Sequence, residues 1–153
     1  MYPTGQGLLV RRLACNVKGQ TTAGEAFEAD AILNDVTAAV VFEHKAAWLR
    51  EDKILADDHE EFLDQLREKY GVSSNGDERP KGVAQLTKII GAITRREWKG
   101  ERDEFSHLQA IYPVLTVHDE RMAASGLGRF LDDEFRRLLG STPLGVTVHP
   151  LIV

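Results

Sequence analysis

The chain has 153 residues, a formal net charge of −5 and 28% charged residues, an ordinary composition for a globular protein in solution. The acidic balance excludes binding of nucleic acid through the overall charge, so any positive surface has to be local. The single cysteine, Cys15, excludes an intrachain disulfide and predicts a reducing, cytoplasmic environment. The sequence contains neither an apolar run of membrane-spanning length nor a recognisable signal peptide, and its histidines follow no zinc-binding spacing.

The N-terminal part is less regular than the rest of the chain. A glycine-rich lead precedes residues 8–17, which are either a strand or the remnant of a helix. Residues 18–24 (KGQTTAG) have the composition of a loop.

The length of the chain suits a single hydrophobic core, so we expect one domain over residues 1–153.

A β-hairpin is predicted between residues 26 and 45. Residues 27–33 alternate, and one face of this strand consists of Phe27, Ala29, Ala31 and Leu33. Asn34 and Asp35 open a tight turn. The return run, residues 38–42, is apolar and β-branched, which predicts a strand buried on both faces.

The hairpin register brings acidic residues together. If the turn is centred between Val36 and Thr37, Asp30 lies opposite Glu43, and Glu28 lies opposite Lys45 on the same side of the sheet. Two ionised carboxylates side by side repel each other, and a divalent cation between them removes that repulsion. Lys45 is then placed to orient an attacking water and to offset charge on a phosphate.

The alternative interpretation is an exposed cross-strand charge pair that binds no metal. A Glu-x-Lys tripeptide is common, and the chain contains a second copy that starts at Glu51. That copy has no apolar strand before it, whereas Glu43 ends a buried strand and faces an acid. This context favours the metal site. The side chain of His44, between Glu43 and Lys45, is expected to point to the opposite face and to pack there.

A helix and a polar loop are predicted after the hairpin. Trp48 either caps the site or packs in the core, and we expect core packing. Asp58 and Glu61 have the spacing of a capping box, and Gly71 is the expected end of that helix. Its apolar side consists of Phe62, Leu63, Leu66 and Tyr70. Residues 73–82 (SSNGDERPKG) form a polar segment that we expect to be a mobile loop.

The next helix is predicted over residues 83–98. Its apolar side consists of Val83, Leu86, Ile90 and Ile93, and its opposite side consists of Lys81, Gln85, Lys88, Ala92, Arg95 and Arg96. That opposite side is either a solvated helix face or a basic surface for a phosphate backbone. The sequence of the helix does not separate the two. The neighbouring hairpin favours the basic surface.

The C-terminal part is predicted as strand, helix and strand. Residues 108–117 indicate a buried strand in which Pro113 requires a bulge or an edge. A helix follows from Ser125 or Gly126 to about Leu139, with Gly140 as its stop, and residues 145–153 indicate a last strand. Because the C-terminal residues are apolar, we expect the sequence to be a piece of a longer protein or a misassigned reading frame. A second copy or a further domain would then complete the sheet.

One pattern combines Asp30, the hairpin, Glu43-His44-Lys45 and, later in the chain, Gln85 in KGVAQLTKII. Over residues 24–117, this pattern resembles the PD-(D/E)XK nuclease superfamily. The resemblance implies an α/β, restriction-endonuclease-like fold: a mixed central sheet whose β-hairpin carries the site, flanked by helices. It further implies that Asp30 and Glu43 bind Mg²⁺ or Mn²⁺ with help from the His44 backbone carbonyl, and that Asp30, Glu43, Lys45 and Gln85 are catalytic. Ala29 stands where the family motif has proline, and no leading helix is evident before Glu25.

The predicted function is therefore a metal-dependent nuclease that hydrolyses phosphodiester bonds, with DNA as the expected substrate. The expected contacts to nucleic acid are Lys81, Lys88, Arg95 and Arg96. The second interpretation is a non-catalytic module of the same fold that serves in binding or assembly. The third is an unrelated α/β interaction domain whose acids are surface charges.

Overall fold

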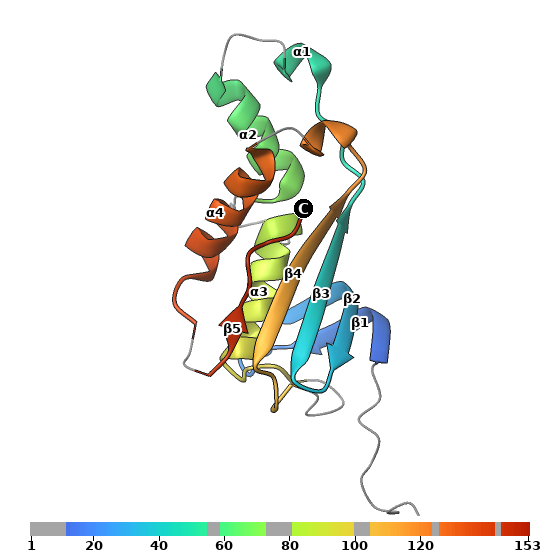
Figure 1. The fold of residues 1–153 in the computed structure, drawn as a ribbon, viewed down its shortest axis with the longest axis vertical. Helices are drawn as coiled ribbons and strands as arrows, with labels where there is room; N and C mark the ends of the chain where they lie inside the picture. The colour runs from blue at the N-terminus through green and yellow to red at the C-terminus, as the bar shows by residue number, and fades with distance from the viewer. Residues whose placement is uncertain (1–11, 55–58, 73–80, 100–104, 124–125, 143–144) are drawn as a thin grey trace, which may run out of the picture.

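The computed structural model describes residues 12–54, 59–72, 81–99, 105–123, 126–142 and 145–153. In chain order the elements are β1 (Arg12–Gln20), β2 (Ala26–Asp35), β3 (Ala38–Lys45), α1 (Glu51–Ile54), α2 (His59–Tyr70), α3 (Gly82–Thr94), β4 (Ala110–Val117), η1 (Glu120–Ala123), α4 (Leu127–Leu139) and β5 (Thr147–Val148). They form one mixed sheet in the order β1-β2-β3-β4-β5, accompanied by α2, α3 and α4 (Figure 1). The predicted α/β class and mixed central sheet are confirmed.

The β2–β3 hairpin has the predicted register. Asp35 pairs with Ala38, so the turn consists of Val36 and Thr37, and Val36 adopts a left-handed backbone (φ 50°). The antiparallel pairing runs to Ala31 and Phe42. Continuing it by one residue places Asp30 opposite Glu43, as the sequence predicts.

Helices cover one face of the sheet. Along β3, Ala39, Val41 and Glu43 are buried, whereas Val40 and Phe42 are half-buried. Figure 1 shows α2, α3 and α4 on the same side, and α3 contacts β2, β3 and β4. The prediction that β3 is buried on both faces is wrong, because α2, α3 and α4 all pack against the same face.

The predicted inner face of β2 is also wrong in its second half. Phe27 and Ala29 are buried, but the next buried residue is Ile32, so the alternation changes phase at Asp30. The neighbouring β1 residue is Asn16, which has a left-handed backbone (φ 51°). β1 and β2 therefore bend together, and Asp30 lies at the bend. β1 includes residues 18–20, which the sequence indicated as loop.

α3 is the central helix of the fold. It ends at Thr94 rather than at the predicted residue 98, and it packs against the sheet and against α4. Ala92 is fully buried, so its predicted place on a solvent-facing basic side is wrong. The chain from β3 to the parallel strand β4 passes through α2 and α3, which form the crossover.

The flanking helices follow the sequence pattern. Gly71 and Gly140, which directly follow α2 and α4, both adopt a left-handed backbone (φ 68° and 66°). Leu66 and Tyr70 of α2 are fully buried, and Phe62 and Leu63 pack against the core at its edge. Asp58, predicted to start this helix, and the predicted mobile loop at residues 73–80 lie outside the described residues.

Pro113 interrupts the pairing of β4 with the C-terminal segment, as predicted, whereas the pairing with β3 runs through it unbroken. β5 pairs Thr147 with Ala110, and further along the chain Val114 bridges to Ile152. The offset between the paired residues grows by one between these two points, so the C-terminal segment bulges opposite Pro113. The predicted strand over residues 145–153 is therefore reduced to Thr147–Val148 and the bridge at Ile152.

Candidate active site

Two carboxylates with different surroundings define the candidate site. Glu43, near the end of β3, is 1% exposed, and its Oε1 lies 2.8 Å from Nζ of Lys45. Its Oε2 is buried and has no hydrogen-bond partner among the described residues. Asp30 is half-buried on β2, and its Oδ2 accepts a hydrogen bond of 2.6 Å from the backbone N–H of His44.

Burial raises the pKa of Glu43 above its ordinary value, and this is the largest influence on the group. The hydrogen bond and the positive charge of Lys45 oppose the rise, the negative charge of Asp30 adds to it, and the Gly82 backbone N–H lowers it. A buried, partly unsatisfied carboxylate beside a second acid is costly to keep ionised. A bound cation would remove that cost.

Gly82 brings the N-terminus of α3 to this carboxylate. Its backbone is left-handed (φ 54°), and an added Cβ would lie 2.1 Å from the Tyr70 carbonyl oxygen, so only glycine fits. The same Cβ would lie 3.4 Å from Cε of Lys45, which shows that the lysine stem passes over the start of α3. The helix N-terminus carries a partial positive charge and favours the ionised acid.

The side chain of His44 points away from the site, as predicted. Its Nδ1 lies 3.0 Å from the Thr116 hydroxyl, and its ring meets that of His118 edge-on at 5.2 Å between centroids. The backbone carbonyl of His44 points toward β2 rather than toward β4. The Lys45 carbonyl accepts from the His118 N–H on the β4 side, and backbone groups alternate along a strand. The His44 carbonyl therefore faces β2 and Asp30, which is the direction required of the implied metal ligand.

Gln85 lies on α3 where the helix contacts β2. Its Nε2 donates a hydrogen bond of 2.5 Å to the Glu28 carbonyl. This contact places Gln85 against the same strand as Asp30, two residues before it. The four residues that the resemblance implies as catalytic thus come from β2, β3 and α3, three elements that contact one another.

The segment that follows Lys45 is fixed by three buried side chains. Asp119 accepts a hydrogen bond of 2.7 Å from the Leu49 N–H, Gln65 accepts one from the Arg50 N–H, and the Tyr70 hydroxyl donates to the Ala47 carbonyl at 3.3 Å. Sequence reasoning missed all three. Only their positions beside turns or on an apolar helix side signalled burial, and nothing in the sequence links them to residues 47–50.

Among these three side chains, Asp119 is also held by an arginine. Arg121 binds it through Nε and Nη2, both at 2.7 Å, and these bonds hold the pKa of Asp119 at about 2, below its usual range. Burial raises the pKa of the neighbouring Tyr70 to about 12. Leu49 is held in the core, whereas Trp48 is 62% exposed. The prediction that Trp48 packs in the core is therefore wrong.

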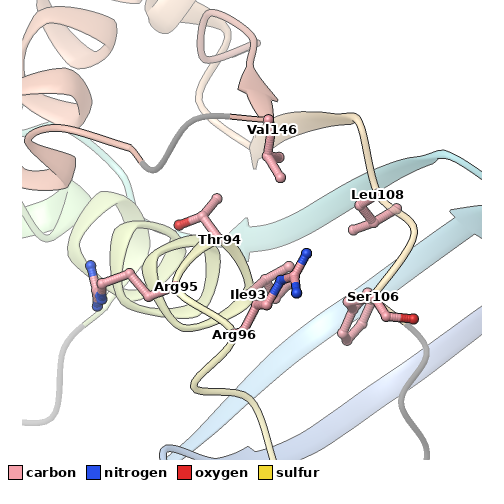
Figure 2. Close-up of a pocket in the computed structure, with 9 residues that line it drawn as sticks. Ile93, Thr94, Arg95, Arg96, Ser106, Leu108 and Val146 are labelled. Carbon is pink, nitrogen blue, oxygen red and sulfur yellow. The ribbon is translucent and has the colours of Figure 1, made fainter.

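The four predicted nucleic-acid contacts have different surroundings. Lys81 precedes α3, Lys88 forms an ion pair with Glu25, and Arg95 forms one with Glu97 at 3.1 Å. Arg95 and Arg96 both line a cavity of about 240 Å³ at the C-terminal end of α3, and their side chains point in different directions (Figure 2). The helix predicted over residues 83–98 ends at Thr94, so Arg95 and Arg96 follow the helix instead of lying on it.

The donor set fits one hard cation rather than a cluster. Across the described ranges, no group of three or more His, Cys, Asp or Glu side chains is placed to hold a metal. Two carboxylates and a backbone carbonyl suit Mg²⁺, which keeps several waters and often binds through one or two carboxylates. The unpaired Oε2 of Glu43 is the observation that fits such an ion. Glu43 itself is almost fully buried.

Comparison of the chain with family models, curated proteins and solved structures finds no match in any of the three. Among the helices in the described part of the chain, none has the length and apolar character needed to span a membrane.

Proposed function

We propose that the protein is a metal-dependent phosphodiesterase that hydrolyses nucleic acid, with DNA as its substrate. The observation that carries the proposal is the buried Glu43 carboxylate, which binds Lys45 through one oxygen and has no partner in the described residues for the other. Asp30 lies across the strand pair, close enough for its charge to raise the pKa of Glu43. Buried carboxylate oxygens are normally hydrogen-bonded, so this oxygen is a candidate ligand for a cation.

In this proposal Asp30 and Glu43 hold one Mg²⁺ or Mn²⁺, and the His44 carbonyl contributes a third oxygen. The ion, when bound, lowers the pKa of a water and offsets charge on the scissile phosphate. Lys45 orients the attacking water and stabilises the negative charge that develops on the phosphate. Gln85, held against β2, helps to position the substrate backbone.

The fold supports a restriction-endonuclease-like architecture as part of the proposal. The hairpin of β2 and β3 carries the acids, α3 brings Gln85 to the hairpin, and β4 runs parallel to β3 beyond it. Lys81, which directly precedes Gly82, is the proposed phosphate contact nearest to Glu43. Lys88 follows on the same helix, whereas Arg95 and Arg96 lie beyond the opposite end of α3.

A non-catalytic module of the same fold is the second candidate. The burial of Glu43 favours it, because a substrate phosphate has to reach the ion that this carboxylate holds. The two candidates separate in one assay. Cleavage of DNA that requires Mg²⁺ and stops with a chelator supports the enzyme, whereas binding of DNA without cleavage supports the module.

Metal binding tests the site directly. Titration of the protein with Mg²⁺ in a calorimeter is expected to show one site, and Asp30→Ala is expected to abolish the binding heat because it removes one of two carboxylates. Glu25→Gln is the matched control, since Glu25 is an exposed acid that pairs with Lys88. Equal binding by wild type and Asp30→Ala would refute the assigned site.

Glu43→Gln should separate stability from function. Because burial raises the folded pKa of Glu43, its contribution to stability is lost as the pH rises through that pKa. With chelator at neutral pH, Glu43→Gln removes the cost of burying a charge but also removes the partner of Lys45, so the free energy of unfolding is expected to change by less than about 1 kcal/mol. The measurement is urea unfolding with and without Mg²⁺. Mg²⁺ should stabilise the wild type and leave the variant unchanged, and a destabilised variant with an intact Mg²⁺ effect would contradict the proposal.

A further inference from the structure

The face of the sheet opposite the helices is apolar and open. The register aligns two rows of side chains across the strands on this face. They are Leu13, Leu33, Val40 and Tyr112, and then Cys15, Ala31, Phe42, Val114 and Ile152. We call these nine residues the open face. No described element covers it, since α2, α3 and α4 all lie on the other side (Figure 1).

The exposure of the open face is graded from its centre to its edges. Val40 and Phe42, on the central strand, are half-buried by their neighbours alone, while Leu13 and Ile152 at the two edges are 61% and 51% exposed. Neither row contains a charged residue. A sheet face that remains in water normally carries polar side chains. The open face therefore has the composition of a buried surface.

Polar side chains border this apolar centre on two sides. His44 and Thr116 form the next row along the strands and are joined by a hydrogen bond of 3.0 Å. On the side of β5, the ring of His149 stacks on Tyr112 at 4.1 Å between centroids. An apolar centre within a polar rim is the usual anatomy of a protein–protein interface.

The width of the open face decides what can cover it. Strands are spaced about 4.8 Å apart, so five of them span roughly 20 Å, whereas one helix is about 10 Å wide. The apolar residues reach both edges, so a single helix would leave half of them in water. The sheet of a second copy has the same width and the same apolar rows.

The size of the open face sets what else a dimer contact must include. Its nine positions, each about 4.8 Å by 6.8 Å, cover about 300 Å², the lower end of the range of the largest apolar patches on monomers, roughly 300 to 600 Å². A standard interface of roughly 800 Å² per partner therefore also has to include the polar residues that border the face. A two-fold arrangement needs a surface that complements itself, and an uncharged apolar sheet meets that requirement.

We propose that the protein is a homodimer in which two open faces pack against each other as a β-sandwich. Aligned sheets pack about 10 Å apart with their inner side chains interdigitated, and Phe42 lies at the centre of the contact. Glu43 and Lys45 project from the other side of β3. Both candidate active sites would lie away from the dimer contact, so this inference does not rest on the proposed function.

The test is the mass of the 153-residue chain in solution, measured by light scattering after size exclusion at loading concentrations between 1 and 100 µM. The wild type is expected to be a dimer, and Phe42→Glu is expected to weaken association by at least a hundredfold. Leu13→Glu tests the edge of the face at an exposed position, should Phe42→Glu fail to fold. Arg129→Glu, on the far side of α4 and 87% exposed, introduces the same charge and should remain dimeric.

Cys15 reports on coverage because it is the only cysteine and belongs to the open face. Its reaction with a maleimide is expected to be slow in the wild-type dimer and fast in Phe42→Glu. A monomer with reactive Cys15 at 100 µM would overturn the proposal. A monomer with protected Cys15 would also overturn it, since a segment of the same chain would then cover the face. A dimer that both glutamate variants leave intact would place the interface elsewhere.

Discussion

Lys45→Ala is expected to lower the rate of Mg²⁺-dependent DNA cleavage by roughly two to three orders of magnitude, the usual cost of removing one group that stabilises charge in the transition state. The fold and Mg²⁺ binding should persist, because Asp30 and Glu43 remain. The ammonium lies 2.8 Å from Glu43, and the Lys45 side chain is 19% exposed, so it can reach a substrate beside the acid. The measurement is single-turnover cleavage of a labelled duplex, with calorimetry of Mg²⁺ binding on the same sample.

Lys69→Ala is the matched control for this prediction. Lys69 pairs with an exposed glutamate on α2, Glu68, at 3.3 Å and has no contact with the site. It should cleave at the wild-type rate. Lys45→Arg adds a second comparison, because it keeps the charge but changes the donor geometry. Cleavage by Lys45→Ala at the wild-type rate would remove Lys45 from the mechanism, whatever the metal does.

The hairpin could be predicted from the sequence because its determinants are local. The alternation before Asn34, the turn residues and the β-branched return run together fix the register, which runs to Ala31 and Phe42 and, continued by one residue, places Asp30 opposite Glu43. The alternation of β2 then fails at Asp30. That failure follows from the bend shared with Asn16 of β1, and the sequence of β2 alone contains no signal for it.

Trp48 and Leu49 show where local pattern stops being informative. Both are large and apolar, and the sequence offers no reason to bury the smaller one. The choice depends on Asp119, seventy residues away, which binds the Leu49 N–H. Fixing that backbone group holds Leu49 in the core and leaves Trp48 at the surface.

The helix pattern of α3 failed for a related reason. Its polar residues at helical spacing predicted one solvated side, but the helix is central and packs against both the sheet and α4. Ala92 is fully buried, and the side chains of Arg95 and Arg96, beyond Thr94, point in different directions (Figure 2). Periodicity shows which residues share a side of a helix, not how many sides the fold covers.

Asp119→Ala is expected to destabilise the protein by about 3 kcal/mol, because it leaves a buried N–H at Leu49 without a partner and Arg121 without its carboxylate. The side chain is fully buried, so water cannot replace the lost contacts. Urea unfolding at neutral pH measures the change. Asp52→Ala is the matched control, since Asp52 pairs with Arg50 at the surface and should cost under about 0.5 kcal/mol.

The same carboxylate predicts how stability depends on pH. Its folded pKa of about 2 is below the ordinary value of 3.8, so its contribution is complete above about pH 4 and is lost as the pH falls towards 2. Wild type should therefore lose stability over this window more steeply than Asp119→Ala, and the two unfolding free energies should converge. Parallel curves would show that Asp119 contributes through packing rather than through its charge. A variant as stable as the wild type at neutral pH would show that the segment after Lys45 does not depend on this contact.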